Sequence, residues 1–425
     1  MNTNSPRHER SYLLPFLSMV LLFFIVGFLT TANAQFQAPL RSAFLSQVGG
    51  MKNSLVTLIT FSWFLAYPLT GPLGARWVDR HGYKSTLIRG LMVMAVGLGL
   101  FSLSSIVTSA WPSSMVCIGS GAIPVGFFVF LLGSFVAGAS ATILQVVINP
   151  YLVACEVRHT QGVQRMAMGG TANSIGTTLA PYFVSGIIFG GLSVEEVSVD
   201  RLTWPFLILM SFIIILILVL SRFSLPDIQK AHVARGEKLK ESVWSFSHLT
   251  LGVVAIFFYV GCEVCIGGNI NLYVISDLHG SVASATLMAT LYWGGLLVGR
   301  LISSMLSKVS PRAQLTFTTT AAIALVTAAM LTDNPWLLIA VGLCHSIMWG
   351  CIYTLAVAHL GKYMSAASGV FMIGVIGGAV LPLVQGIMAD GLGSWRWSWS
   401  IVLVGEVCML AYALVGSRIY KTADE

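Results

Sequence analysis

Charge is what this sequence lacks most. Of its 425 residues, 23 are Lys or Arg and 16 are Asp or Glu, together 9%, whereas a soluble globular domain carries roughly 25% charged residues. Hydrophobic residues make up 56%, and the mean hydropathy is +0.84. This combination excludes a disordered chain and argues against a soluble enzyme. The composition therefore predicts an integral membrane protein.

Patterns for metal, phosphate and nucleic-acid chemistry are also missing. The seven cysteines lie in or beside apolar runs, and Cys262 and Cys265, although spaced as CxxC, are best interpreted as small packing residues. No nucleophile–base pair, metal-ligand set or phosphate-binding loop is found. The basic residues lie in short gaps between apolar runs, which does not favour nucleic acid as a partner. We expect neither an enzyme nor a cofactor or metal site.

Apolar runs long enough to cross a bilayer are abundant instead. A membrane helix needs roughly 20 mostly apolar residues, and a helix satisfies its own backbone groups in lipid. The alternating pattern of barrel strands is not seen. The sequence predicts an all-α membrane protein with twelve transmembrane helices, near 11–36, 53–75, 87–108, 125–154, 166–191, 202–221, 250–276, 284–305, 313–332, 335–359, 363–389 and 397–417.

The basic residues predict the direction of these helices. With a cytoplasmic N-terminus, 19 of the 23 basic residues fall in inner segments and only Arg41, Lys52, Arg201 and Arg396 in outer ones. Cytoplasmic loops carry an excess of Lys and Arg. We therefore expect both termini in the cytoplasm, and no Lys or Arg in the middle of a membrane helix.

The chain divides into two similar halves. The longest polar connection predicts an N-terminal six-helix bundle over 1–221, a cytoplasmic linker over 222–248 and a C-terminal six-helix bundle over 249–425. Gly176 and Pro181 in one half have the same spacing as Gly377 and Pro382 in the other, and FIVG in 24–27 is echoed by FYVG in 258–261. Half-chain repeats are how many transporters place a site at the midplane of the membrane.

A short segment after the second apolar run carries a motif. Its residues Asp79, Arg80, Gly82 and Lys84 match the loop signature of the major facilitator superfamily, with Ala75 where that signature usually has Gly. A tight turn with a carboxylate and basic side chains near helix ends can latch and release during a rocking motion. We interpret it as a gating loop; the alternative is an ordinary basic cytoplasmic loop.

Amides and aromatic residues dominate the polar positions inside the expected membrane helices, where polar residues are costly and mark function. Amides suit neighbouring hydroxyl groups, and an indole offers a flat apolar face. A carboxylate or phosphate substrate would need a basic residue in mid-membrane. We hypothesise a site for a neutral monosaccharide; for any single residue the alternative is a hydrogen bond between helices. The candidate substrate-binding residues are Asn33, Gln35, Gln145, Asn149, Asn173, Asn269, Trp293, His345 and Trp349.

Two acidic residues lie in mid-membrane positions, Glu263 and Glu406. A buried carboxylate can bind a proton because loss of water disfavours its charged form, and it could instead bind Na⁺. We hypothesise that Glu263 is the ion-coupling residue and interpret Glu406 as a packing or subsidiary residue. His345 either donates to a substrate hydroxyl, titrates near neutral pH, or bonds within the bundle.

Five segments carry a more specific resemblance. They resemble the fucose:proton symporter branch of the major facilitator superfamily, and more narrowly its bacterial glucose/galactose transporters, over nearly the whole chain. The resemblance implies the twelve-helix major facilitator fold, a central sugar site reached alternately from each side, a monomer, and the bacterial cytoplasmic membrane. The segments are LQVVINPYLVA (144–154), NSIGTTLAPYF (173–183), YVGCEVCIGG (259–268), YWGGLLVGR (292–300) and GGAVLPLVQGIMAD (377–390).

Residue by residue, the resemblance supports the site unevenly. Gln145, Asn149 and Asn173 match the glucose/galactose relatives, as does Glu263, but Ala34 stands where relatives have the aspartate implicated in proton coupling. The expected function is secondary active import of a hexose such as glucose or galactose with H⁺ or Na⁺. The alternatives are a facilitator or symporter for fucose or an amino sugar, and a sugar sensor. The sequence leaves the sugar and the ion open.

Overall fold

The protein is helical almost throughout. The computed structural model describes residues 13–45, 48, 51–118, 121–155, 157, 162–192, 198–223, 225, 241–305, 309–360, 363, 367 and 370–419. Its N-terminal half contains α1 (Leu13–Gln35), α2 (Gln37–Leu45), α3 (Lys52–Ala110), α4 (Val125–Ala154), α5 (Gly162–Tyr182), η1 (Phe183–Ile188), η3 (Val199–Leu202) and α6 (Thr203–Arg222). Its C-terminal half contains η4 (Val243–Ser245), α7 (Ser247–Ser276), α8 (Val282–Met305), α9 (Pro311–Thr332), α10 (Pro335–Ala356), η6 (Met372–Ile376), α12 (Gly377–Leu392), η7 (Arg396–Trp399), α13 (Ser400–Leu414) and η8 (Gly416–Arg418).

These helices confirm the predicted all-α membrane fold. Among the residues described, 11 helical segments are long and apolar enough to cross a membrane, and α3 supplies two of them, Lys52–Val78 and Arg80–Ala110. Helix α5 is not among the eleven; it carries a series of polar residues, among them Asn173 and Thr177, and continues into the π-helical turn η1. Together α5 and η1 form the remaining long helix.

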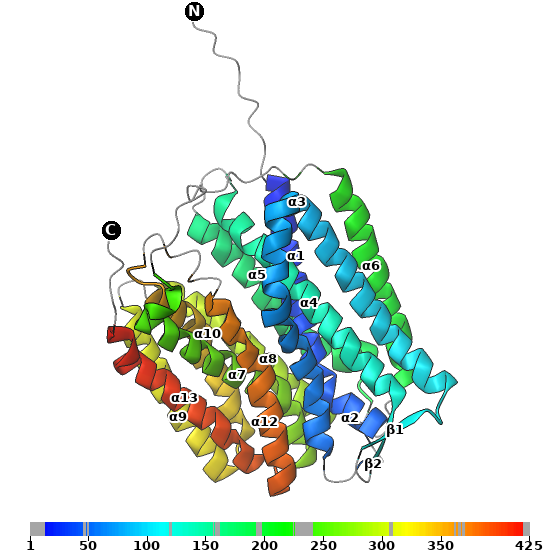
Figure 1. The fold of residues 1–425 in the computed structure, drawn as a ribbon. Coiled ribbons are helices and arrows are strands. Elements are labelled where there is room, and N and C mark those ends of the chain that lie inside the picture. The colour runs from blue at the N-terminus through cyan, green and yellow to red at the C-terminus, as the bar shows by residue number, and fades with distance from the viewer. Residues whose placement is uncertain are drawn as a thin grey trace, which may run out of the picture.

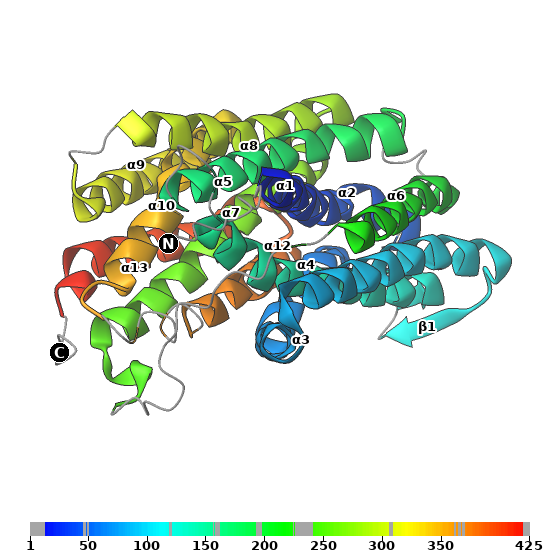
Figure 2. The same ribbon diagram turned by 90° about the horizontal axis from the view of Figure 1, so that it is seen from above.

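The helices form two groups that face each other (Figure 1). Seen from above, α5 of the first group lies beside α8 of the second, and α3 packs against α12 (Figure 2). We call the face where α1 begins the Leu13 face, and the face that carries α2 and the β1–β2 hairpin the hairpin face (Figure 1). The boundaries proposed at 221 and 248 stay predictions.

Two local features differ from the expected pattern. A short antiparallel hairpin, β1 (Met115–Ile118) and β2 (Gly121–Pro124), occupies the gap between α3 and α4. The expected loop over 76–86 is instead helical on both sides of Gly82, where φ is 77° and ψ is 173°. Glycine adopts positive φ without the clash that a Cβ would cause. The chain therefore turns at one residue rather than over a long loop.

Candidate functional site

A cavity of about 250 Å³ lies between the two halves. The first half lines it with α1, α3, α4 and α5, and the second half with α7, α8, α10 and η6. On α1 the lining begins at Ala34 and follows successive turns back to Phe23, toward the Leu13 face. Ala34, for which the resemblance implies an aspartate in relatives, thus lines the cavity.

The polar wall of the first half consists of three amides that the sequence predicted, Gln145, Asn149 and Asn173. Gln145 Nε2 donates to Tyr67 Oη at 2.8 Å, and Asn173 Nδ2 donates to the backbone oxygen of Phe23 at 3.0 Å. These bonds hold both side chains in place. Asn149 Oδ1 is buried and accepts no hydrogen bond within the described part of the chain. It is an acceptor that a ligand hydroxyl can satisfy.

The second half supplies two indoles, Trp293 on α8 and Trp349 on α10. Trp293 Nε1 is buried and donates to no atom among the residues described. Gly267 on α7 leaves room for this ring, because a Cβ built there would lie 2.3 Å from Trp293 Cζ2. Trp349 stands edge-on to Tyr259 and Phe371, with ring centroids 6.2 and 5.9 Å apart.

Two opposite charges line the same cavity, Glu263 on α7 and Arg300 on α8. Glu263 Oε1 accepts a hydrogen bond of 3.1 Å from Tyr259 Oη. Arg300 donates across the interface to Ser174 Oγ and, at 3.5 Å, to the oxygen of Gly170, both on α5. The sequence led us to expect no Lys or Arg in the middle of a membrane helix. Arg300 lies near the end of α8, and its long side chain reaches the cavity from there.

Four of the predicted substrate-binding residues do not line the cavity: Asn33, Gln35, Asn269 and His345. Asn33 bonds within the first half, to Ile59 O and Ser134 Oγ. Asn269 donates to Gln385 Oε1 at 2.9 Å within the second half. These amides form the interhelical hydrogen bonds that were the alternative interpretation, and His345 lies behind the cavity wall.

Gln35 instead joins the two halves on the hairpin side of the cavity. Its Nε2 donates to the oxygen of Gly267 at 2.8 Å, and its Oε1 accepts from Asn271 Nδ2 at 2.5 Å. Nearer the hairpin face, the carboxylate of Asp390 on α12 accepts hydrogen bonds from the backbone N–H groups of Asn53 and Ser54, at 3.1 and 2.7 Å. These two contacts close the hairpin side of the cavity.

The predicted gating loop lies on the opposite face. Lys84 Nζ donates to the oxygen of Ser221 at 2.8 Å, a contact within the first half, and Arg80 is exposed. The Asp79 side chain lies outside the described residues. With Gly82 at the turn, the segment has the compact geometry that the motif predicts, and its role as a gate stays a prediction.

Sequence reasoning missed three residues at or beside the site: Tyr67, Tyr259 and Arg300. Tyr259 lies four residues before Glu263, and side chains spaced i, i+4 meet on one helix face, so this pair could have been found. Tyr67 and Arg300 depend on which helices are neighbours. No local pattern in the sequence reveals that arrangement.

Comparison with known proteins identifies the family. The pattern of the Major Facilitator Superfamily matches residues 23–376. The chain belongs to this superfamily. A glucose/galactose transporter of Brucella abortus is 31% identical over 430 residues, with 98% of both chains covered. The L-fucose-proton symporter of Escherichia coli is 22% identical, covering 91% of this chain and 89% of its own.

A solved structure supports the same fold. The xylose transporter of E. coli in its inward-open conformation superposes with a TM-score of 0.68, at 14% identity, with 97% of each chain covered. The two groups of helices are therefore the two halves of a major facilitator, and the cavity lies between them. The protein is a member of a transporter superfamily, not an enzyme.

Proposed function

We propose that this major facilitator is a secondary active transporter that imports a neutral monosaccharide, such as glucose or galactose, together with a proton. The relatives named as glucose/galactose transporter and L-fucose-proton symporter, which align over nearly their whole lengths, support a sugar substrate and proton coupling. Alternating access follows when the two halves rock about the cavity between them.

One observation carries the substrate class. On opposite walls of the cavity, Asn149 Oδ1 and Trp293 Nε1 are a buried acceptor and a buried donor without partners among the residues described. A sugar hydroxyl can donate to an amide oxygen and accept from an indole N–H, whereas an apolar ligand can do neither. The volume of about 250 Å³ lies just below the range of roughly 300–1,000 Å³ for drug-sized ligands, which fits a small solute.

The charges of the cavity favour a neutral solute. While Glu263 is ionised, its charge and that of Arg300 cancel at the cavity wall, so the lining has no net charge to select an anion or a cation. Arg300 is already engaged with Ser174. The Glu263 carboxylate accepts a hydrogen bond from Tyr259 at the cavity wall. We assign Glu263 as the carboxylate that binds the coupled proton.

The substrate contacts follow from the lining. We assign them to Gln145, Asn149 and Asn173 in the first half and to Trp293 and Trp349 in the second. Gln35 acts at the closure on the hairpin side, and the 79–84 segment acts as the gate on the Leu13 face. The bias of basic residues toward the Leu13 face supports a cytoplasmic location for that face, in the bacterial inner membrane.

Counterflow tests the substrate class directly. Purified protein in proteoliposomes loaded with unlabelled glucose should exchange this glucose for external labelled glucose. External unlabelled glucose should competitively inhibit the uptake of labelled galactose. Fucose and glucosamine in the same panel test the two alternative solutes. Protein that exchanges none of these sugars would rule out the proposal, and preferential exchange of glucosamine would assign the carboxylate of Glu263 to substrate binding instead.

A further inference from the structure

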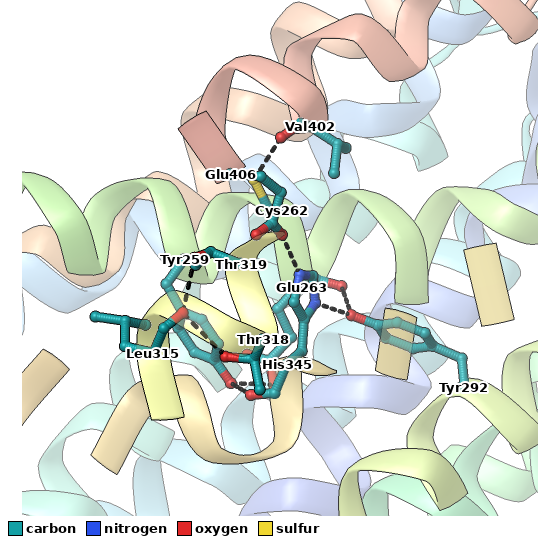
Figure 3. A network of polar contacts seen from close by, with 10 residues as sticks. All are labelled: Tyr259, Cys262, Glu263, Tyr292, Leu315, Thr318, Thr319, His345, Val402 and Glu406. Carbon is teal, nitrogen blue, oxygen red and sulfur yellow. Dashed lines mark hydrogen bonds and ion pairs between the residues drawn. The ribbon is translucent and has the colours of Figure 1, made fainter. Parts of the chain in front are cut away.

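A buried ionisable pair lies behind the wall of the cavity, in the second half (Figure 3). His345 Nε2 on α10 and Glu406 Oε1 on α13 are 2.6 Å apart, and both side chains are 0% exposed. Glu406 Oε2 is buried and accepts no hydrogen bond within the described part of the chain. An ionised carboxylate with one oxygen unsatisfied is costly in such surroundings.

Both ring nitrogens of His345 have a partner. Tyr292 Oη lies 2.7 Å from His345 Nδ1 and 3.2 Å from the backbone oxygen of Glu263. When Tyr292 donates to that carbonyl, Nδ1–H donates to Tyr292, and the short contact between Nε2 and Oε1 requires one further proton. In this state the pair is net neutral, whether as imidazolium and carboxylate or as imidazole and carboxylic acid. When Tyr292 donates to Nδ1 instead, Nε2–H donates to the Glu406 carboxylate, and the pair carries one negative charge.

Removal of that proton would leave one negative charge without a cationic partner. The ionisable groups that face Glu406 are Tyr259 and Cys262 on α7, Tyr292 on α8 and Cys344 on α10, all of them neutral acids in their ordinary state. Glu263 is a further charged group near His345, and Arg300 lies beyond Glu263. Helix α9 contributes Thr318 and Thr319, whose hydroxyls bond to carbonyls of their own helix.

The pair is connected to the cavity through two tyrosines (Figure 3). Tyr259 Oη contacts both Glu263 Oε1 at 3.1 Å and the oxygen of His345 at 3.0 Å, and Tyr292 joins His345 to α7. The three helices that hold the pair in this way, α7, α8 and α10, also carry Glu263, Trp293 and Trp349 of the cavity wall. A change in the proton count of the pair therefore alters the helices that contact the sugar.

We propose that His345 and Glu406 form a second proton-binding site, which retains its proton while sugar is bound and gives it up during the return step. This proposal rests on the proposed function and extends it. On release, the neutral pair becomes neutral His345 and a Glu406 carboxylate. The released proton passes to a water molecule. Rebinding reverses each step, so no proton is created or lost.

The test separates sugar exchange from proton movement in full-length protein reconstituted in proteoliposomes. E406Q is expected to keep glucose counterflow within about twofold of wild type and to lose about tenfold or more of sugar-evoked proton uptake, measured with a pH indicator dye. D333N is the matched control, because Asp333 is a half-exposed partner of Arg396 and Tyr273 at the hairpin face. It should keep both activities.

The possible outcomes distinguish the two proposals. Wild-type protein without counterflow would refute the proposed function itself. Proton uptake in E406Q equal to wild type would overturn the second proton site. If E406Q is poorly folded, H345Q/E406Q replaces the pair by two amides; loss of counterflow in that variant as well would assign the pair a purely structural role. Infrared difference spectra provide a direct readout: sugar should perturb a carboxylate or carboxylic-acid band that disappears in E406Q and persists in E263Q.

Discussion

Asn149 and Trp293 both line the cavity, and each has a buried polar atom without a partner among the residues described. Asn33, away from the cavity, uses both of its side-chain polar atoms in hydrogen bonds, whereas Asn269 donates to Gln385 and has a buried Oδ1 without a partner among the residues described. At the residue scale, recognition therefore depends on a few unsatisfied groups held by well-bonded neighbours. Buried polar groups without partners are uncommon in native structures, so such groups are the natural places for a ligand.

The first prediction concerns Glu263. E263Q keeps the shape of the side chain and an acceptor for Tyr259 but cannot take up a proton. We expect accumulation of sugar against its gradient to be lost, because the coupled ion no longer binds, while counterflow continues. Uptake into energised vesicles measures accumulation, and exchange in de-energised vesicles measures counterflow. Unchanged accumulation by E263Q would remove Glu263 from the coupling mechanism.

The second prediction uses two neighbouring glycines of α7 as a matched pair. A Cβ at Gly267 would lie 2.3 Å from the ring of Trp293, whereas a Cβ at Gly268 meets its nearest atom at 3.4 Å. G267A should displace the indole and raise the KM for sugar by about tenfold, corresponding to about 1.4 kcal/mol. G268A should change KM by less than about twofold. Equal KM values for the two variants in initial-rate uptake would exclude a substrate role for this face of Trp293.

Residues of the site differ in how far the sequence could predict them. Gln145, Asn149 and Asn173 could be recognised because an amide within an apolar run needs a polar partner whatever its neighbours are. His345 satisfies the same criterion, yet it bonds to Glu406 and Tyr292 rather than to the cavity. Which side of a helix faces a cavity depends on its packing, and a helix that is apolar all round has no amphipathic stripe to show this.

At the scale of elements, α3 and α12 form the closure on the hairpin side. The carboxylate of Asp390 binds the first free N–H groups of α3, where the helix dipole also favours a negative charge. Ser54 Oγ adds a further hydrogen bond to the same carboxylate. One residue of the second half thus caps a helix of the first, and this cap must break when the cavity opens on the hairpin side.

The third prediction follows from this cap. D390N removes the charge and should weaken the closure by about 1 kcal/mol, so the population open on the hairpin side should rise about fivefold. Labelling of A34C by a membrane-impermeant thiol reagent measures that opening, in a C117S background because Cys117 is exposed. D333N, which removes a carboxylate on the same face but within one half, should not change the rate. An unchanged labelling rate in D390N would show that the cap does not control opening.

The elements also show where sequence patterns stop being informative. The long apolar helices could be predicted because length and hydropathy are local properties. The turn at Gly82 is shorter than expected, since one glycine at positive φ reverses the chain without a loop. The β1–β2 hairpin was not predicted because its strands, Met115–Ile118 and Gly121–Pro124, are only four residues each.

At the scale of the whole molecule, the distribution of charge relates the fold to the membrane. Among the residues described, most Lys and Arg lie toward the Leu13 face, and cytoplasmic loops carry an excess of Lys and Arg, so we proposed that this face is cytoplasmic. Cys117, in the hairpin, is exposed, whereas the other cysteines are buried or half-buried. The fourth prediction is that an impermeant maleimide added outside spheroplasts labels wild-type protein and not C117S. Labelling that occurs only after lysis would reverse the proposed orientation.

The two halves, the cavity between them and the opposite charges of Glu263 and Arg300 together describe a transporter for a neutral sugar that moves with a proton. Accumulation driven by a proton gradient tests this most directly. Proteoliposomes with an alkaline interior should concentrate labelled glucose above its external level, and a protonophore should abolish the gradient of sugar. An equal sodium gradient at uniform pH should produce none. Accumulation driven by sodium alone, or uptake that only equilibrates under the proton gradient, would contradict the account.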